Sequence, residues 1–393
     1  MEDVFVLSAV RTPIGKYGGG LASVPLCDLA AKVVREAVSR AGVSADDVGH
    51  VVFGNVIHTE PRDMYLSRVA AINGGLNIET PALTLNRLCG SGMQAIVSAA
   101  QAIMLGDCEV AVAGGAESMS RVPYWLPGMR WGQRMGDGAV IDAMVGAVSD
   151  PFDGCHMGVT AENVAADFHV SREDQDALAA ESHRRAAAAT AAGYFKEQIL
   201  PVEIPGRKGK VTVIDSDEHI RADVSLEDMA RLRPAFAKDG TVTAGNASGI
   251  NDAAAAVVLA SESFVRSSGF TPLGRLVGYA LAAVEPRIMG MGPVPSTRNV
   301  FARTGLKVDE IDVFEVNEAF AAQALAVSRE LDLPPDRTNP NGSGISLGHP
   351  VAATGAILAV KSLYELKRTG GRYALATMCI GGGQGISAIF ERV

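Results

Sequence analysis

The two ends of this chain align with each other at a separation of 263 residues. Three pairs of segments keep this separation, the last with one residue skipped: "CGSG" (89–92) over "AATG" (352–355), "VAVAGGA" (110–116) over "YALATMC" (373–379), and "AGVSADDVGHVVFGNV" (41–56) over "TGLKVDEIDVFEVNE" (304–318). A duplicated unit is the simplest explanation, although Ala- and Gly-rich sequences also align with themselves by chance. Two related halves packed about a pseudo-dyad would bring Cys89 and the 349–355 segment to equivalent helix starts.

Strand-like and helix-like runs alternate near the start of the chain, which predicts an α/β fold with helices covering mixed or parallel sheets. The runs are "DVFVLSAV" (3–10), "LCDLAAKVVREAVSRAG" (26–42), "HVVFGNVI" (50–57) and "MYLSRVAAING" (64–74). At 393 residues, the chain is too long for one ordinary core.

The middle of the chain differs from both ends, with Pro-rich turns, a charged helix-like run (171–193) and a polar stretch (206–225). We interpret it as an insertion that carries loops. The expected division is a first core domain (1–120 with 247–268), a loop domain (121–246) and a second core domain (269–393).

Charge and cysteine content exclude several classes of protein. The net charge is −9 and Lys and Arg form no cluster, so we expect no nucleic-acid partner. Five widely spaced cysteines without a CxxC pair argue against a secreted disulfide framework and indicate a reducing, cytoplasmic location. No basic region precedes an apolar run at the N-terminus, and no run resembles a membrane span.

Cys89 lies in "NRLCGSGMQAI", between a strand-like and a helix-like run. At a helix start, unpaired N–H groups and the helix dipole favour a thiolate, while Gly90 and Gly92 allow close approach of other atoms. The other interpretation is a buried structural cysteine, which is the commonest fate of a free cysteine.

Three further segments place candidate residues at junctions between elements. His349 is held between Gly348 and Pro350 ahead of a helix-like run, where a fixed imidazole suits acid–base catalysis. Cys379 ends an apolar strand before three glycines whose N–H groups suit an oxyanion. Asn317 follows a strand, either as a site residue or as a helix N-cap. A structural histidine, a flexible turn or a phosphate loop are the simpler alternatives.

The remaining candidates are weaker. No two of Cys89, His349 and Cys379 lie close together in the sequence as a pair of metal ligands would, and no fourth ligand is evident, so we expect no metal. Cys27 and Cys108 fall in helix-like amphipathic runs and are expected in the core, and Cys155 adjoins His156 in a loop.

Taken together, "NRLCGSGMQAI", "NEAFAAQ", "NPNGSGISLGHP" and "CIGGGQG" resemble the signatures of the thiolase family, in its order and spacing. The "VRTPIGKYGG" start, "AGGAESMS", "HMGVTAENVA" and "TAGNASGINDAAAA" also match, so the resemblance extends from near residue 4 to the end. It is strongest to bacterial broad-substrate β-ketothiolases of the biosynthetic type. It implies the thiolase fold, with two duplicated βαβαβαββ domains in αβαβα layers.

The resemblance also implies a mechanism. Cys89 matches the nucleophile that takes an acyl group from a CoA thioester, and His349 matches the residue that removes its proton. Cys379 matches the acid/base acting on the α-carbon of acetyl-CoA. Asn317 matches the residue whose bound water forms one oxyanion hole with His349, and the N–H groups of Cys89 and Gly381 match the second. The expected reaction joins acetyl-CoA to an acyl-CoA, or cleaves 3-ketoacyl-CoA with CoA, which is a substrate; no cofactor is expected.

Substrate contacts and assembly follow from the same resemblance. The residues implied to bind CoA and the acyl group are His156, Met157, Arg221, Phe236, Ala244, Ser248, Met289 and Phe320. The family suggests a homotetramer, a dimer of dimers, with contacts in 121–140. One departure is Ala352, where the family usually has glycine, with Val351 in place of isoleucine. The alternatives are a decarboxylating condensing enzyme, which usually pairs its cysteine with two histidines, and a non-catalytic acyl-CoA or lipid-binding protein.

Overall fold

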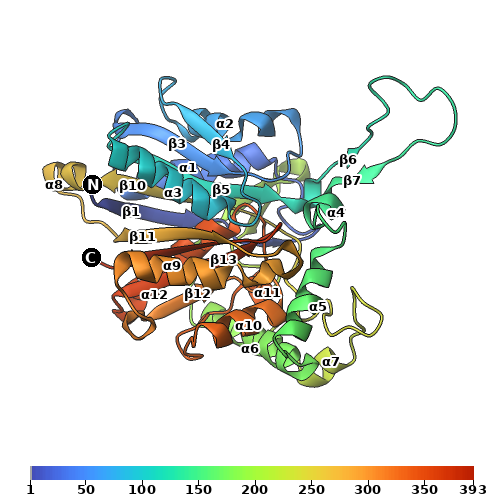
Figure 1. The fold of residues 1–393 in the computed structure, drawn as a ribbon. Coiled ribbons are helices and arrows are strands. Elements are labelled where there is room, and N and C mark those ends of the chain that lie inside the picture. The colour runs from blue at the N-terminus through green and yellow to red at the C-terminus, as the bar shows by residue number, and fades with distance from the viewer. Residues whose placement is uncertain (1) are drawn as a thin grey trace.

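A computed structural model describes residues 2–393 and shows an α/β fold with two related halves (Figure 1). The first half contains β1 (Val4–Arg11), β2 (Gly15–Lys16), α1 (Leu26–Ala41), β3 (Val48–Gly54), α2 (Leu66–Gly74), β4 (Ala82–Leu85), α3 (Ser91–Leu105), β5 (Val110–Ser118), β10 (Asn251–Ser261) and α8 (Glu262–Ser268). The second contains β11 (Gly274–Ala283), α9 (Pro293–Thr304), β12 (Val313–Val316), α10 (Ala321–Glu330), α11 (Gly344–Leu347), α12 (Thr354–Thr369), β13 (Tyr373–Ile380) and β14 (Gln384–Glu391).

The strands form one continuous sheet in the order β12-β13-β14-β11-β1-β10-β5-β3-β4, with β2 added beside β10. Among the strands of residues 2–393, the two halves pair where Val4–Val6 meet Gly274–Leu276, antiparallel, so each half keeps its own group of strands. The parallel pairs β3–β5 and β12–β13 occupy equivalent places in the two halves. The counterpart of the β3–β4 pair is a single parallel bridge between Phe314 and Thr338.

Helices form three layers around these strands. α1 and α2 pack on the first half and α9 on the second, while α3 and α12 contact each other between the halves. α3 begins at Ser91 and α12 at Thr354, which reproduces the 263-residue separation of the sequence repeat. The alternation of elements expected from the sequence is therefore confirmed, and so is the central helix pair expected near Cys89.

Small residues build the centre of the sheet. β10 reads "NDAAAAVVLAS" and is buried along its whole length, because helices and neighbouring strands cover both faces. β5 is likewise buried throughout and pairs with β10 from Val110 to Ser118. A strand buried on both faces is apolar without alternation, which explains this continuous run.

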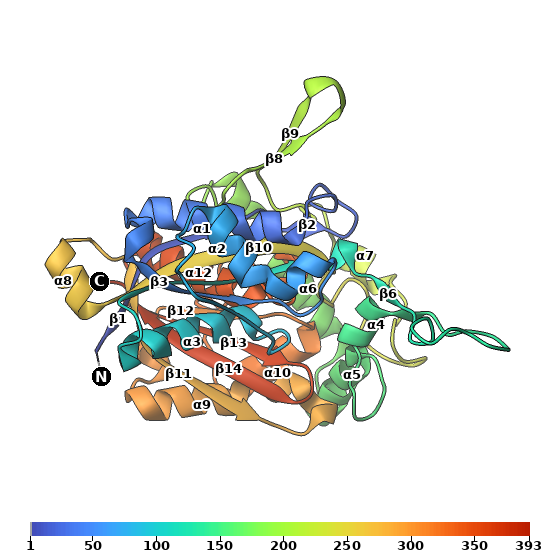
Figure 2. The same ribbon diagram turned by 90° about the horizontal axis from the view of Figure 1, so that it is seen from above.

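Residues 121–246 add no strand to the main sheet. They form β6 (Tyr124–Trp125), β7 (Ile141–Asp142), α4 (Ala143–Ala147), α5 (Met157–Asp167), α6 (Arg172–Ala191), β8 (Val202–Pro205), β9 (Val211–Ile214) and α7 (Leu226–Ala230). The β6–β7 connection projects far from the body (Figure 1), and β8–β9 projects in a second direction (Figure 2). The exact domain boundaries given above stay a prediction.

Two details differ from the sequence interpretation. Cys108 lies beyond the end of α3, in the turn before β5, and not within a helix. Residues 88–105, which contain α3, have the length and composition of a membrane span, although more than half of this window is buried inside the protein.

Candidate active site

Cys89 lies in a tight turn between β4 and α3. The Ser91 hydroxyl closes this turn, accepting the Arg87 N–H at 2.8 Å and donating to the Leu88 carbonyl at 2.6 Å. Leu88 has a φ of 45°, in the left-handed region that side chains other than glycine rarely adopt. The hydrogen bonds of the turn hold Leu88 in this conformation. Strained backbone of this kind commonly occurs at functional sites.

The environment of the Cys89 sulfur differs from the expectation of a stabilised thiolate. Burial raises the pKa of Cys89 to about 11, although the N–H groups of Gly381 and Cys89 itself lie at the sulfur and lower it. The prediction of a thiol made acidic by the helix start was therefore wrong for the free protein. Desolvation outweighs the helix dipole here, because the side chain is enclosed.

His349 follows the short helix α11 and precedes α12, which confirms the helix expected after it. Its backbone N–H donates to Asn251 Oδ1 at 2.9 Å, and Nδ1 lies 2.6 Å from Thr354 Oγ1. The Thr354 hydroxyl donates its proton to the Pro350 carbonyl at 2.9 Å, so it accepts from Nδ1–H. Nε2 is thereby left unprotonated, and burial lowers the pKa of His349 to about 4, which keeps the ring neutral.

Cys379 lies near the end of β13, and Gly381 begins the turn into β14. Burial raises the pKa of the Cys379 thiol, and the negative charge of a Cys89 thiolate would raise it further. A Cβ at Gly381 would lie 2.2 Å from Met157 Cε, the flexible end of that side chain, so Met157 would have to move to make room for it.

Asn317 directly follows β12 and is fully buried. Its Nδ2 lies 3.5 Å from His349 Nε2, while its Oδ1 has no hydrogen-bond partner within residues 2–393. The alternative of a helix N-cap is excluded, because α10 begins four residues later and is preceded by Phe320. A buried amide oxygen without a partner is suited to hold a water molecule.

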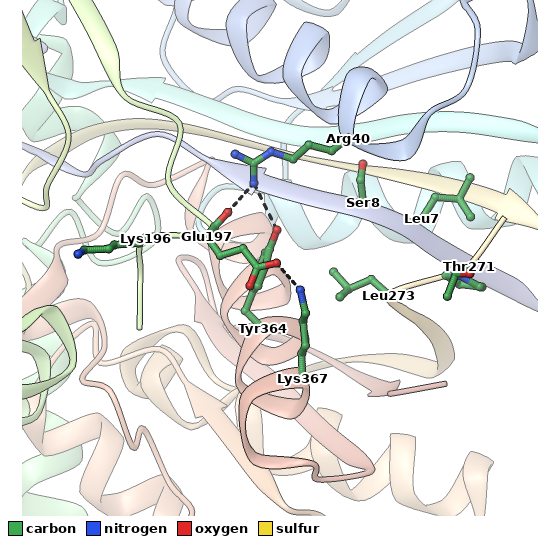
Figure 3. A pocket seen from close by; sticks show the side chains of 10 residues that line it. Leu7, Ser8, Arg40, Lys196, Glu197, Thr271, Leu273, Tyr364 and Lys367 are labelled. Atoms are coloured by element: carbon green, nitrogen blue, oxygen red, sulfur yellow. Dashed lines mark hydrogen bonds and ion pairs between the residues drawn. The ribbon is translucent and has the colours of Figure 1, made fainter. Parts of the chain in front are cut away.

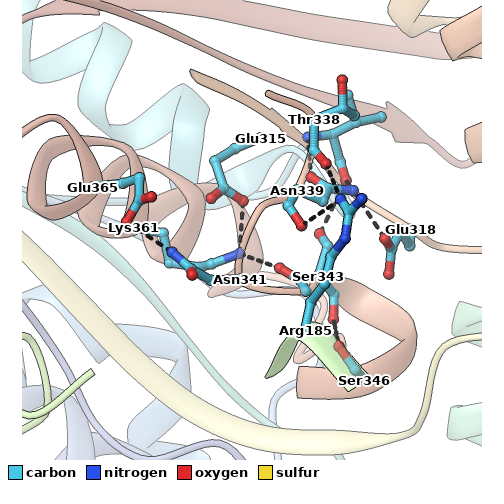
Figure 4. A network of polar contacts seen from close by, with 12 residues as sticks. Arg185, Glu315, Glu318, Thr338, Asn339, Asn341, Ser343, Ser346, Lys361 and Glu365 are labelled. Carbon is cyan, nitrogen blue, oxygen red and sulfur yellow. Dashed lines mark hydrogen bonds and ion pairs between the residues drawn. The ribbon is translucent and has the colours of Figure 1, made fainter. Parts of the chain in front are cut away.

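A buried polar network fixes the segments around Asn317 (Figure 4). Glu318 accepts hydrogen bonds from Ser182 Oγ at 2.6 Å and Asn339 Nδ2 at 2.9 Å. Lys361 Nζ donates to Glu315 Oε2 at 2.6 Å and to the Gly342 carbonyl at 2.5 Å. The network joins α6, β12, α12 and the 339–344 loop, so it fixes the positions of these elements relative to one another.

The candidate catalytic residues open into a cavity of about 780 Å³. Cys89, His349 and Cys379 line it, together with all eight residues expected to bind CoA and the acyl group: His156, Met157, Arg221, Phe236, Ala244, Ser248, Met289 and Phe320. Asn317 and Gly381 are not among the residues that line this cavity. Segments far apart in the sequence thus converge on one cavity, which is large enough for a drug-sized ligand.

Aromatic side chains shape one wall of this cavity. The His156 ring stacks on Phe236 with centroids 4.6 Å apart, and Phe236 meets the edge of Phe320 at 6.2 Å. His156 Nδ1 accepts the Gly158 N–H at 3.0 Å, which caps α5 and fixes the ring. A Cβ at Gly158 would lie 2.2 Å from Phe236, so this close packing requires glycine.

Two family models match the chain. The model "Thiolase, N-terminal domain" matches residues 4–263, and "Thiolase, C-terminal domain" matches residues 270–392. The chain belongs to the thiolase family. This confirms the resemblance found in the sequence, and with it the expected enzyme class, an acyltransferase.

Relatives of this thiolase match over its whole length. It is 64% identical over 393 residues to the beta-ketothiolase BktB of Cupriavidus necator, covering 100% of both chains. It is 49% identical to an acetyl-CoA acetyltransferase of Chromobacterium violaceum, over 99% of this chain and 100% of the relative. The acetyl-CoA acetyltransferase of Bacillus anthracis superposes with a TM-score of 0.98 at 45% identity, covering 100% of this chain and 99% of the other. Human mitochondrial 3-ketoacyl-CoA thiolase in complex with CoA superposes with a TM-score of 0.97 at 44% identity, covering 100% of this chain and 98% of the other. These likenesses confirm the thiolase fold.

Sequence reasoning about this thiolase missed Glu117, a buried carboxyl in β5 beside the reactive residues. It accepts hydrogen bonds from Asn55 Nδ2 at 3.0 Å and from the N–H groups of Val56, Ile57 and Ala352 at 3.1–3.2 Å. Burial raises its pKa to about 8, against the opposing effect of these donors. The one signal in the sequence was a glutamate at the end of the apolar run "VAVAGGAES".

A second cavity of the thiolase, about 660 Å³, has none of the candidate catalytic residues in its lining (Figure 3). Three of its polar side chains are linked through Glu197: Arg40 donates to the Glu197 carbonyl at 2.6 Å and to Tyr364 Oη at 3.3 Å, and Lys367 pairs with the Glu197 carboxylate. These bonds hold α1, the 195–197 segment and α12 together, so the hollow has a structural explanation.

Within residues 2–393, no group of three or more His, Cys, Asp or Glu side chains is arranged to hold a metal ion. Cys155, the other cysteine singled out in the sequence, is half-buried beside His156 and does not line the large cavity.

Proposed function

We propose that this thiolase is an acyl-CoA:acetyl-CoA C-acyltransferase that works through an acyl group on Cys89. The observation that carries the proposal is the convergence of Cys89, His349 and Cys379 on one cavity. The eight expected ligand contacts line the same cavity, which supports a CoA thioester as the substrate.

In the first half-reaction, His349 Nε2 takes the Cys89 proton as the sulfur attacks the thioester carbonyl. The tautomer set by Thr354 leaves this nitrogen ready to accept it. The carbon–sulfur bond of the thioester then breaks, and the proton returns from His349 to the departing CoA sulfur. The N–H groups at the Cys89 sulfur, those of Gly381 and Cys89, are placed to stabilise the oxyanion.

In the second half-reaction, His349 Nε2 first takes the thiol proton of Cys379, and the Cys379 thiolate then takes a proton from the α-carbon of acetyl-CoA. Its raised pKa makes the thiolate a stronger base, which suits the weak acidity of this carbon. The enolate attacks the acyl-Cys89 carbonyl, the carbon–sulfur bond to Cys89 breaks, and 3-ketoacyl-CoA leaves. His349 then gives its proton to the Cys89 sulfur, so both cysteines end the cycle as thiols and the protons balance.

The proposal is tested with the purified chain and acetoacetyl-CoA. Addition of CoA should cause loss of enolate absorbance, and radiolabelled acetyl-CoA should label the wild type but not Cys89→Ser. Full labelling of Cys89→Ser would refute the nucleophile assignment. Binding without cleavage would favour a non-catalytic protein, and carbon dioxide release from a malonyl thioester would favour a decarboxylating condensing enzyme.

Cys379→Ala separates the two half-reactions. It should keep acylation of Cys89 and lose exchange of the α-protons of acetyl-CoA with solvent. If both steps were lost together in a folded variant, the proposed division between the two cysteines would be wrong.

We also propose a homotetramer that uses the projecting β6–β7 segment. This segment exposes Trp125, Met129, Trp131 and Met135, the last two at 87% and 91%, and apolar side chains this exposed are typical of an interface. Light scattering should give the mass of a tetramer at micromolar concentration. Replacing residues 126–140 with a short Gly-Ser turn should reduce that mass, whereas an unchanged tetramer would exclude this segment as the contact.

A further inference from the structure

The large cavity changes character from its inner end to its rim. Its inner end is formed by buried side chains, among them Cys379, Met289 and Met157. Its rim contains the exposed side chains of Lys16 and Arg221. A ligand that fills this cavity therefore has its reactive end among apolar groups and its other end beside positive charge.

Lys16 ends β2 and begins the loop that continues to Gly20. Most of this loop belongs to the "VRTPIGKYGG" segment, to which no function has been given. Glu218 fastens this loop: its carboxylate accepts the Lys16 N–H at 3.1 Å and the Gly20 N–H at 3.0 Å. Ser120 Oγ accepts the Gly18 N–H at 2.9 Å, and Asp252 in turn fixes Ser120.

The glycines of the loop are needed for this attachment. A Cβ at Gly19 would lie 2.3 Å from Glu218 Oε2, and one at Gly20 would lie 2.9 Å from Oε1. Gly18 has a φ of 66°, in the region that favours glycine. The loop thus wraps around a carboxylate and presents Lys16 on a fixed backbone.

The positive charges at the rim are available for a ligand. Within residues 2–393, the Lys16 ammonium and the Arg221 guanidinium form no ion pair, and the hydrogen bonds of these two residues involve their backbone groups. Glu218 is the one carboxylate among the cavity-lining residues, and backbone N–H groups already occupy both its oxygens. Two unpaired cations at one rim, in a chain of net charge −9, indicate an anionic ligand end.

We propose that Lys16 binds a phosphate group of the CoA ligand and so contributes to recognition of the nucleotide end. This inference rests on the proposed function, because CoA carries its negative charge on a diphosphate and a 3′-phosphate, away from the thiol. Lys16 acts on binding, since it lies at the rim and the reacting sulfurs lie at the buried end.

The test compares Lys16→Ala with the wild type on three substrates of thiolysis: acetoacetyl-CoA, acetoacetyl-dephospho-CoA and acetoacetyl-pantetheine. With acetoacetyl-CoA, KM should rise about fivefold at low salt with kcat unchanged, which is typical of one lost charge-assisted contact. The increase should shrink at high salt because screening weakens the contact. Lys16→Arg should restore most of the affinity. Lys307→Ala, which removes an exposed lysine that does not line the cavity, serves as the matched control.

The pantetheine substrate decides the outcome. It has no phosphate, so the KM of Lys16→Ala should match the wild type. An equal rise in KM with pantetheine, or no rise with acetoacetyl-CoA, would overturn the proposal while leaving the proposed function intact. If the effect disappears with the dephospho substrate, Lys16 binds the 3′-phosphate; if it persists there, Lys16 binds the diphosphate. Absence of thiolysis by the wild type would overturn both proposals.

Discussion

Gly92 and Gly355 occupy equivalent positions in the first turns of α3 and α12, and each lies directly against the other helix. A Cβ at Gly92 would lie 2.7 Å from the Ala352 carbonyl oxygen and the Ala356 nitrogen, and one at Gly355 would lie 2.4 Å from the Met93 nitrogen. The two helix starts therefore meet backbone to backbone. This contact brings the turn of Cys89 and the turn of His349 to the same place.

Gly92→Ala tests this contact. The added methyl group meets backbone atoms, which move only if α12 shifts, so we expect a loss of about 1–3 kcal/mol of stability. Activity should fall more than stability suggests, because the shift displaces the residues between Ala352 and His349. Thermal unfolding and kcat for thiolysis check both effects. Gly138→Ala is the control, since its Cβ would meet no atom closer than 3.8 Å; equal behaviour of the two variants would contradict the assigned contact.

The ionisation of Cys89 gives a second prediction. With a pKa raised to about 11 and a neutral His349, the free enzyme holds a thiol at neutral pH. The thiolate is the species that reacts with iodoacetamide, so the alkylation rate of Cys89 should rise about tenfold per pH unit from pH 6 to pH 10. Mass spectrometry of the Cys89 peptide measures the rate, and Cys89→Ser provides the background. A plateau below pH 8 would instead show a thiolate–imidazolium pair.

Much of this site was predictable from the sequence, because its residues stand at recognisable junctions. Cys89, Cys379 and Asn317 lie beside the ends of apolar strands, and the repeat predicted that the Cys89 and His349 turns would meet. The family signatures then assigned a function to each of them. Strand ends and repeats are local patterns, and local patterns survive in a single sequence.

The remaining features depend on how the assembled chain excludes water. The raised pKa of Cys89 follows from burial by segments far away in the sequence, and the local signal of a helix start pointed in the opposite direction. The positive φ of Leu88 is imposed by a turn that carries no glycine there. Lys16 reaches the cavity because Glu218, some 200 residues later, fastens its loop. No periodicity or motif in the sequence encodes such distant contacts.

The buried ion pair between Lys361 and Glu315 gives a third prediction (Figure 4). The two side chains are 2% and 0% exposed, so Lys361→Met leaves an unpaired buried carboxyl and should cost about 3–5 kcal/mol. Lys367→Met, which breaks the exposed pair with Glu197, is the matched control and should cost about 1 kcal/mol or less. Urea unfolding compares the two.

The double variant Lys361→Met/Glu315→Gln should recover part of the loss, because the remaining buried group is then uncharged. Burial already raises the pKa of Glu315 to about 7, in agreement with this direction. Equal losses in the single and double variants would show that Lys361 acts through its bond to the Gly342 carbonyl and not through charge.

Ala352, where the family usually has glycine, gives the last prediction. Its φ lies outside the left-handed region, so the methyl group causes no backbone strain. Its carbonyl faces Gly92 and Gly115, and its N–H donates to Glu117 Oε2 at 3.1 Å. Both interactions use backbone atoms, which glycine also has.

Ala352→Gly should therefore cost only about 0.5–1 kcal/mol of stability, from the greater freedom of the unfolded chain, and leave kcat/KM within about twofold. Glu117→Ala, which removes the acceptor itself, should lower activity much further. Thiolysis rates with C4 and C5 3-ketoacyl-CoA measure both variants. A changed ratio of these rates in Ala352→Gly would mean that the methyl group shapes the acyl site after all.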